Sequence, residues 1–216
     1  MFDPHSDAHR VDTLEALRTH YRHAHAGTRG KERPALDAAT AAVAERCRFA
    51  GIGTFDADGN ADVSPRGGPS GFIRVLDPTH LAMADLGGNN RLDTLENIVT
   101  TGRVGLLLIT PGKTETVRVN GSAFISTDPE LLHGFRLPKV PKSAIVITVD
   151  TTYVHCAKAF MRSGMWDQAV WEELADVPDG AAILSCQGVV DIDATATRQW
   201  LDDDYARALA DEAAPG

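Results

Sequence analysis

The residues of this sequence best suited to chemistry are those that could hold an anion. In residues 82–103 a short apolar segment leads into a Gly-Gly-Asn-Asn-Arg turn at 87–91, and a stretch with helical periodicity follows. The free N–H groups of a first helical turn, the positive end of the helix dipole and a neighbouring arginine together favour a bound anion. The spacing predicts a phosphate site at the start of this helix, with Asn89 or Asn90 as the N-cap.

A purely structural role for the same residues is also open. Asn90 would cap the helix, Asp93 would complete a capping box three residues later, and Arg91 would be an exposed surface charge.

Two further arginines stand out in the sequence. Arg66 lies in the segment Ser-Pro-Arg-Gly-Gly-Pro (64–69), which is expected to be a loop after a strand. Arg118 stands between two valines, so strand alternation points it away from the core, either to solvent or to a polar site on the outer face.

Other motifs are excluded by their spacing. Residues 112–114 read Gly-Lys-Thr, but the glycine that a P-loop needs five positions earlier is Leu107. His20, His23 and His25 lie close together, yet no carboxylate or cysteine completes a ligand set, so no metal site is predicted.

Composition limits the possible partners and compartment. The 216 residues are 43% hydrophobic, enough for a domain of about 150 residues with terminal additions. A net charge of -9 disfavours nucleic acid and anionic membranes as partners. Three widely spaced cysteines indicate neither a disulfide framework nor a zinc site. No segment has the length of a membrane span and the N-terminus lacks an apolar signal core, so a cytoplasmic protein is expected.

The elements that would position the arginines are mainly strands. Alternating apolar segments begin near residue 48 and are separated by turns at 56–60, 77–79 and 111–114, with one helix inserted after the fourth strand. Six or seven antiparallel strands at this spacing predict a closed or nearly closed β-barrel with flanking helices, an α+β fold that is mainly β.

The flanks are expected to be helical. We predict an N-terminal helical arm over 1–33, with its helix at 12–25, and a second helix at 34–47. The central domain would occupy 34–167, and a helical extension would occupy 168–216.

Taken in order, several segments resemble one known family. They are SPRGG, LAMAD, GGNNR, RVGLLLI, VRVNG and HCAKAFMRS, spread over roughly residues 35–167. This order resembles the pyridoxamine 5'-phosphate oxidase-like flavoproteins, and within them an FMN-binding subgroup rather than the oxidase itself. The resemblance implies a split β-barrel, a homodimer, and FMN bound in two clefts at the subunit interface.

The resemblance also implies roles for individual residues. Arg91 and the turn before it would hold the FMN phosphate, Arg66 would be the second cation, and the backbone of residues 83–85 would contact the flavin edge. Two weaker candidates, Lys158 and Trp166, would come from the partner subunit or face the substrate. The full implied set for cofactor binding is Ser64, Arg66, Gly67, Met83, Ala84, Asp85, Asn89, Asn90, Arg91, Arg118, Asn120 and Lys158.

The implied activity is FMN-dependent transfer of hydride or electrons between a nicotinamide donor and a small-molecule acceptor. No catalytic side chain is identified. Oxidation of pyridoxamine phosphate is not expected, because the chain has a Gly-Pro-Ser-Gly insertion between Arg66 and Arg74 and lacks the Arg-x-x-Pro ending of the oxidase. Three alternatives stay open: a protein that binds the deazaflavin F420, one that binds haem through a histidine such as His80, His133 or His155, and a flavin-binding module without turnover.

Overall fold

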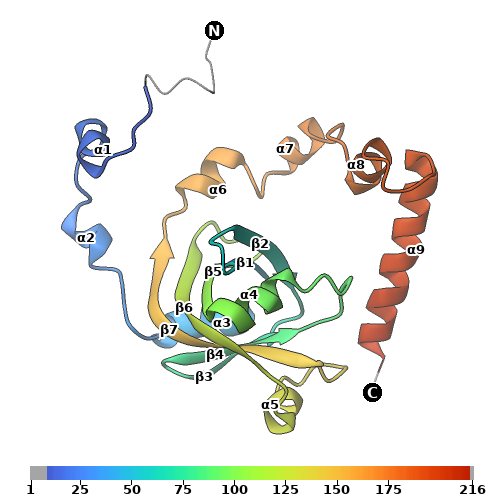
Figure 1. The fold of residues 1–216 in the computed structure, drawn as a ribbon, viewed down its shortest axis with the longest axis horizontal. Coiled ribbons are helices and arrows are strands. Elements are labelled where there is room, and N and C mark those ends of the chain that lie inside the picture. Colours follow the sequence, from blue (N-terminus) through green and yellow to red (C-terminus); the bar gives the residue numbers. More distant parts are fainter. Residues whose placement is uncertain (1–8, 215–216) are drawn as a thin grey trace. The chain divides into compact units, whose positions relative to one another are not determined.

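The computed structural model describes residues 9–214, shown in Figure 1. The chain divides into two compact units, Met1–Glu32 and Arg33–Gly216. In the first unit two short helices, α1 (Leu14–His20) and α2 (Ala26–Arg29), replace the single helix predicted over residues 12–25. Neither helix buries a side chain, and a helix without packing is marginal below about 12 residues, which accounts for the break.

The second unit is built on one antiparallel sheet of seven strands, as the sequence predicts. The strands are β1 (Phe49–Phe55), β2 (Ala61–Gly67), β3 (Ile73–Asp77), β4 (His80–Asp85), β5 (Arg103–Ile109), β6 (Thr116–Ser126) and β7 (Ser143–His155). Their order in the sheet is β2-β1-β5-β6-β7-β4-β3. The expected α+β split barrel is confirmed.

The sheet is not closed, so the expectation of a closed or nearly closed barrel needs correction. Strands β2 and β3 are the two ends of the sheet and do not pair with each other. Strand β2 pairs only with β1, and this free edge accommodates Pro65, which has no N–H to donate to a neighbouring strand. Because β2 is an edge strand, other elements of the chain can contact its side chains.

A tight turn holds the first hairpin in register. Between β1 and β2, the carboxylate of Asp56 accepts the N–H groups of Asp58 and Asn60, and Gly59 adopts a φ of +86°. Hydrogen bonds from the side chain and backbone of Asn60 lower the pKa of Asp56. Both features match the turn expected from the sequence.

A bulge in β6 and β7 bends the sheet at Gly121. The register shifts between Asn120 and Gly121, and Asp150 of β7 is left without a cross-strand partner. A Cβ at Gly121 would overlap the carbonyl oxygen of Thr148, so only glycine fits this close approach.

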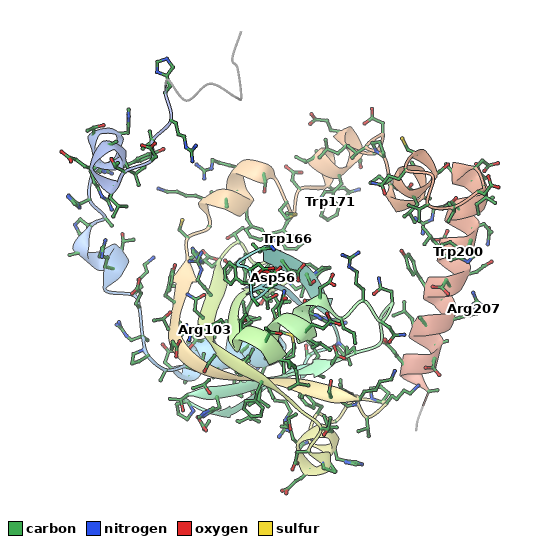
Figure 2. The ribbon with its side chains drawn as sticks, in the orientation of Figure 1. Asp56, Arg103, Trp166, Trp171, Trp200 and Arg207 are labelled. Atoms are coloured by element: carbon green, nitrogen blue, oxygen red, sulfur yellow. The ribbon has the colours of Figure 1, made fainter. Side chains whose placement is uncertain are left out.

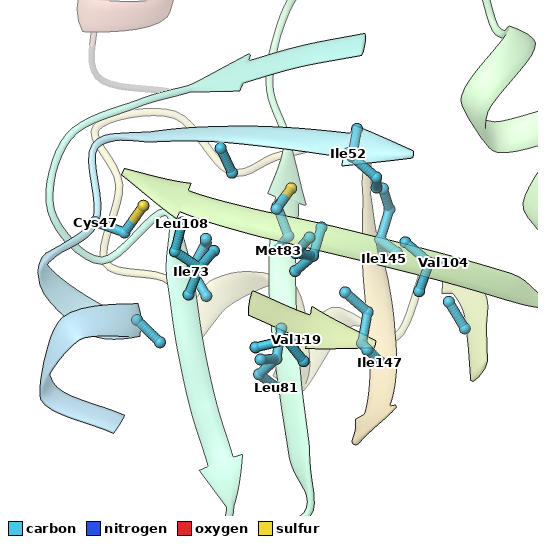
Figure 3. Close-up of a cluster of buried hydrophobic side chains, with 14 of the residues drawn as sticks. Cys47, Ile52, Ile73, Leu81, Met83, Val104, Leu108, Val119, Ile145 and Ile147 are labelled. Carbon is cyan, nitrogen blue, oxygen red and sulfur yellow. The ribbon is translucent and has the colours of Figure 1, made fainter. Parts of the chain in front are cut away.

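The core lies on the inner face of the curved sheet (Figure 3). It is covered by α3 (Ala38–Arg46), which packs on β3 and β6, and by α4 (Asp93–Thr101), which packs on β1, β2, β5 and β6. The fully buried side chains of largest volume are Phe72, Ile52, Ile73, Leu81, Met83, Ile98, Leu106, Leu108, Ile145 and Ile147.

Helices make up the rest of the unit. They are α5 (Pro129–His133) before β7, then α6 (Lys158–Ser163), α7 (Gln168–Glu173), α8 (Gly180–Cys186) and α9 (Ala194–Ala213) after it. The chain's three tryptophans, Trp166, Trp171 and Trp200, all belong to this last part, as Figure 2 shows. Within the described residues no helix combines the length and the apolar character that crossing a membrane requires.

Candidate functional site

The start of α4, where the sequence predicts an anion site, is a helix end without a side-chain cap. The helix begins at Asp93, and its N-cap residue is Leu92, whose side chain makes no capping hydrogen bond. The prediction of Asn89 or Asn90 as N-cap is therefore wrong. Asn90 instead takes a φ of +58°, and the Asn89 side chain accepts the N–H of Arg91 at 3.0 Å. Both asparagines shape the preceding loop, and the first N–H groups of α4 receive no side-chain cap.

Arg91 lies beside this helix end and is largely exposed. Its Nε donates to the carboxylate of Asp93. This hydrogen bond, the charge of Asp93 and the charge of Asp62 all raise the pKa of Arg91. Because Asp93 pairs with Arg91, and Leu92 is the N-cap, the capping box between Asn90 and Asp93 is not formed.

Strand β2 supplies the second arginine. The segment containing Ser64 and Arg66 was expected to be a loop, but β2 continues through Gly67. Arg66 Nη1 lies 3.0 Å from Asp85 Oδ1, and the two side chains are 21% and 18% exposed. Since Asp85 ends β4, this ion pair joins the edge strand to a strand near the opposite end of the sheet.

A carboxylate that was not predicted from the sequence, Asp62, precedes both arginines in the chain and contacts strand β2 and helix α4. Asp62 Oδ2 accepts the Thr94 hydroxyl at 3.2 Å and the Ser64 hydroxyl at 3.3 Å. Alternation along β2 could have placed Asp62 on the same face as Ser64. Its contact with Thr94, 32 positions away, depends on the packing of α4 against β2.

These residues fit a phosphate in some respects and oppose it in others. The Nε of Arg66 is buried and has no hydrogen-bond partner within the described residues, and the first turn of α4 has no side-chain cap. Both features suit an anionic ligand. Carboxylates at Asp62, Asp85 and Asp93, however, already occupy the hydroxyls and guanidinium groups that a phosphate would use.

Three other predicted residues lie within the sheet. Met83 and Ala84 are buried, and β4 is paired on one side with β3 and on the other with β7. Gly67 is the last residue of β2, opposite Phe49 of β1. Of the predicted segment 83–85, only Asp85 has a partly exposed side chain.

Arg118 and Asn120 lie on the outer face of the sheet. Arg118 is opposite Leu107 of β5 and Tyr153 of β7, and its guanidinium carbon lies 5.3 Å from the centre of the Tyr153 ring. The Asn120 amide reaches Thr151 Oγ1 at 3.4 Å.

Ser64 and Arg66 lie on the inner face of the sheet, opposite to the face that carries Arg118. Ser64 and Arg66 pair with Ile52 and Ala50, which point into the core. Arg118 shares the other face with Gly51 and Leu107, since directly opposite residues of a sheet share a face. The predicted set of ligands is therefore divided between two faces of the same chain.

Two of the predicted residues, Lys158 and Trp166, follow β7 in the chain. Lys158 opens α6 and is exposed, and Cys156 is also exposed. Trp166 donates its indole N–H to the carbonyl of Lys113 at 2.8 Å, which ties the end of α6 to the turn between β5 and β6.

The histidines considered as haem ligands take part in local contacts. His80 Nδ1 lies 2.9 Å from Asp77 Oδ2, and His133 Nδ1 lies 2.6 Å from the carbonyl oxygen of Pro129. The ring of His155 lies 4.9 Å from that of Tyr153, measured between centres.

Comparison with solved structures finds proteins of similar architecture at low identity. HupZ of Group A Streptococcus is 19% identical, with 54% of this chain and 91% of that chain covered and a TM-score of 0.44. General Stress Protein 26 of Bacillus anthracis is 19% identical, with 52% and 88% covered and a TM-score of 0.40. A protein described as F420 reductase is 19% identical, with 53% and 94% covered and a TM-score of 0.39. These similarities are too low to transfer any activity to this chain.

Comparison with protein families gives a clearer result. No curated protein matches the sequence. The family profile described as pyridoxamine 5'-phosphate oxidase, however, matches residues 36–156, more than half of the chain. The matched range runs from just before α3 to just after β7 and includes Asp62, Arg66, Asp85 and Arg91. The chain therefore belongs to the pyridoxamine 5'-phosphate oxidase family.

Proposed function

We propose that this protein binds FMN and holds the FMN phosphate at the N-terminal end of α4. The observation that carries the proposal is a helix end without a side-chain cap beside Arg91, together with the buried Nε of Arg66, which has no hydrogen-bond partner within the described residues. A helix N-terminus and arginines are the donors that suit a phosphate monoester. Ser64 adds a hydroxyl, and residues 89–91 add the adjoining loop backbone.

The proposed activity is oxidoreduction between a nicotinamide donor and a small-molecule acceptor. Bound FMN would supply hydride or single-electron transfer through its ring. The chain's own residues bind the phosphate and orient the cofactor, and we assign no acid or base to any side chain. Oxidation of pyridoxamine phosphate is not part of the proposal.

We also propose that the protein is a homodimer whose subunits meet through the outer face of β1, β2 and β5. Phe49, Phe55 and Val63 are exposed there, at 43%, 51% and 75%. Gly51 lies on the same face of β1, and because a Cβ there would meet no other atom within 4 Å, it leaves the backbone open to close approach. Exposed apolar side chains gathered on one face are typical of a protein interface.

The dimer gives Arg118 and Asn120 a role that one subunit alone does not. They share the outer face with this apolar patch, whereas the phosphate group lies on the inner face of the same chain. We propose that each subunit's Arg118 and Asn120 serve the cofactor bound by the other subunit.

Binding and turnover can be tested separately. FMN titrated into the full-length protein is expected to bind with quenching of its fluorescence, and NADH or NADPH is expected to reduce the bound flavin in the absence of oxygen. An added quinone should then reoxidise it. FMN binding without reduction by either nicotinamide would support the flavin-binding module instead, and failure to bind FMN would contradict the proposal.

A further inference from the structure

We infer that Asp62 is a specificity-determining residue that limits how much negative charge the site at α4 accepts from its ligand. The inference rests on the proposed function, since it concerns the same phosphate site. It follows from the position of one carboxylate that already occupies part of that site.

The position of Asp62 is fixed by strand pairing. It lies on β2 opposite Thr54, whose side chain is 1% exposed in the core, so the Asp62 side chain points to the inner face of the sheet. There it accepts the hydroxyls of Ser64 and of Thr94, the second residue of α4. Asp62 therefore behaves as an internal anion at the first turn of the helix, where the dipole favours negative charge.

A phosphate at this helix end would compete with Asp62 for the same donors. Ser64 is one of the residues proposed to bind the phosphate, and its hydroxyl donates to Asp62. The charge of Asp62 also acts on Arg91, since it is among the causes that raise the pKa of that guanidinium. A bound phosphate would consequently share both a hydroxyl and an arginine with a fixed carboxylate.

The same inference is supported by the net charge of the group formed by Asp62, Arg66, Asp85, Arg91 and Asp93. Arg66 is paired with Asp85, and Arg91 with Asp93, so each arginine has one carboxylate partner. Asp62 is a third carboxylate, and its hydrogen bonds in the described part of the chain come from hydroxyls. The group carries one net negative charge before any ligand binds, and a phosphate monoester adds about 1.5 to 2 more at pH 7.

Asp62 is therefore expected to reduce the gain in affinity that the phosphate gives FMN over riboflavin. Asp62 repels the phosphate of FMN and leaves riboflavin, which has none, unaffected. Replacing the carboxylate by an amide removes the charge and keeps an oxygen that accepts the hydroxyls of Ser64 and Thr94. The variant Asp62→Asn therefore separates the charge of Asp62 from its hydrogen bonds.

The experiment compares FMN and riboflavin binding to the full-length wild type, to Asp62→Asn and to Asp58→Asn. Asp58 is an exposed residue of the turn between β1 and β2, so its variant makes the same change in net charge away from the site. We expect Asp62→Asn to bind FMN about tenfold more tightly, because a nearby like charge is removed. Riboflavin binding should change less than twofold, and Asp58→Asn should match the wild type for both flavins.

Two results would overturn the inference while leaving flavin binding intact. One is an unchanged FMN affinity in Asp62→Asn, and the other is an equal change for FMN and riboflavin, which would indicate a structural role for Asp62.

Inorganic phosphate is a probe that does not depend on flavin. It should raise the Tm of Asp62→Asn more than that of the wild type, and equal shifts would also count against the inference. A larger shift in the variant with no binding of either flavin would support the role of Asp62 and contradict the proposed function.

Discussion

The two arginines of the proposed site differ in how strongly the fold depends on them. Arg66 is mostly buried and pairs with Asp85 of β4, a strand that is not its neighbour in the sheet. The side chain of Arg91 is 78% exposed and pairs with the nearby Asp93. Interactions of a charge become stronger as water is excluded, and an exposed pair adds little to stability. Arg66 is therefore expected to serve both the fold and the ligand, and Arg91 only the ligand.

The variant Arg91→Ala is expected to weaken FMN binding about tenfold to a hundredfold, the effect of losing a charge-assisted hydrogen bond to phosphate. The Tm of the ligand-free protein should stay the same. Arg207→Ala is the matched control, because the Arg207 side chain on α9 is 73% exposed and pairs with a single carboxylate, that of Asp204. FMN titrations of both variants test this. Equal affinities in Arg91→Ala and the wild type would exclude Arg91 from the phosphate site.

The variant Arg66→Ala is expected to weaken FMN binding and also to lower the free energy of unfolding by about 1–3 kcal/mol, since Asp85 loses its partner. Urea denaturation measures the second effect. Adding Asp85→Ala should restore part of the stability, because no unpaired carboxylate is then left, but it should not restore FMN affinity. If the double variant is less stable than Arg66→Ala, the ion pair is not the source of the loss.

At the scale of elements, the sequence predicts the strands well and their side-chain pairings poorly. Alternation and turn residues such as Asp56 and Gly59 are local signals, and they place the β1–β2 hairpin correctly. The start of α4 was misplaced because two asparagines in a row suit a cap and a left-handed turn equally well, and the chain uses Asn90 for the turn.

The pairings of the site depend on tertiary structure that no local pattern contains. Arg66 and Asp85 are 19 positions apart and belong to strands that are not neighbours in the sheet. The contact of Asp62 with Thr94 requires α4 to pack over β2. The arginines could therefore be identified from the sequence as candidates, but the carboxylates that oppose them could not.

Helix α4 is held on the sheet by side-chain hydrogen bonds as well as by its apolar face. The Asn97 amide donates to the hydroxyl of Thr54, a core residue, at 3.0 Å. The variant Asn97→Ala leaves this buried hydroxyl without its donor and is expected to cost about 1–2 kcal/mol of unfolding free energy. Thr100→Ala is the control on the same helix, since Thr100 is exposed and its hydroxyl donates to the Glu96 carbonyl, within the helix itself. Equal losses in the two variants would contradict a specific role for Asn97, and urea denaturation provides the comparison.

At the scale of the whole molecule, a net charge of -9 surrounds a site proposed to bind an anion. The long-range field does not favour such a ligand, so affinity for FMN must come from local donors and from burial of the flavin ring. A subunit interface would supply that burial. The proposed dimer is therefore a requirement of the proposed function.

Light scattering is expected to give a mass twice that of the 23.1 kDa chain. The variant Val63→Lys places a charge on the proposed interface and should yield the monomer with weaker FMN binding. Val99→Lys is the control, because Val99 has the same exposure, 75%, but lies on α4. A monomeric wild type, or a dimer that Val63→Lys leaves intact, would contradict an interface on the outer face of β1, β2 and β5.

The most direct test of the central claim is the absorption spectrum of the freshly purified full-length protein, with the released ligand identified by its mass. We expect flavin bands near ~375 and ~450 nm and a released compound with the mass of FMN. A colourless protein that also fails to bind added FMN would contradict the account, and a released deazaflavin or haem would assign the site to a different cofactor.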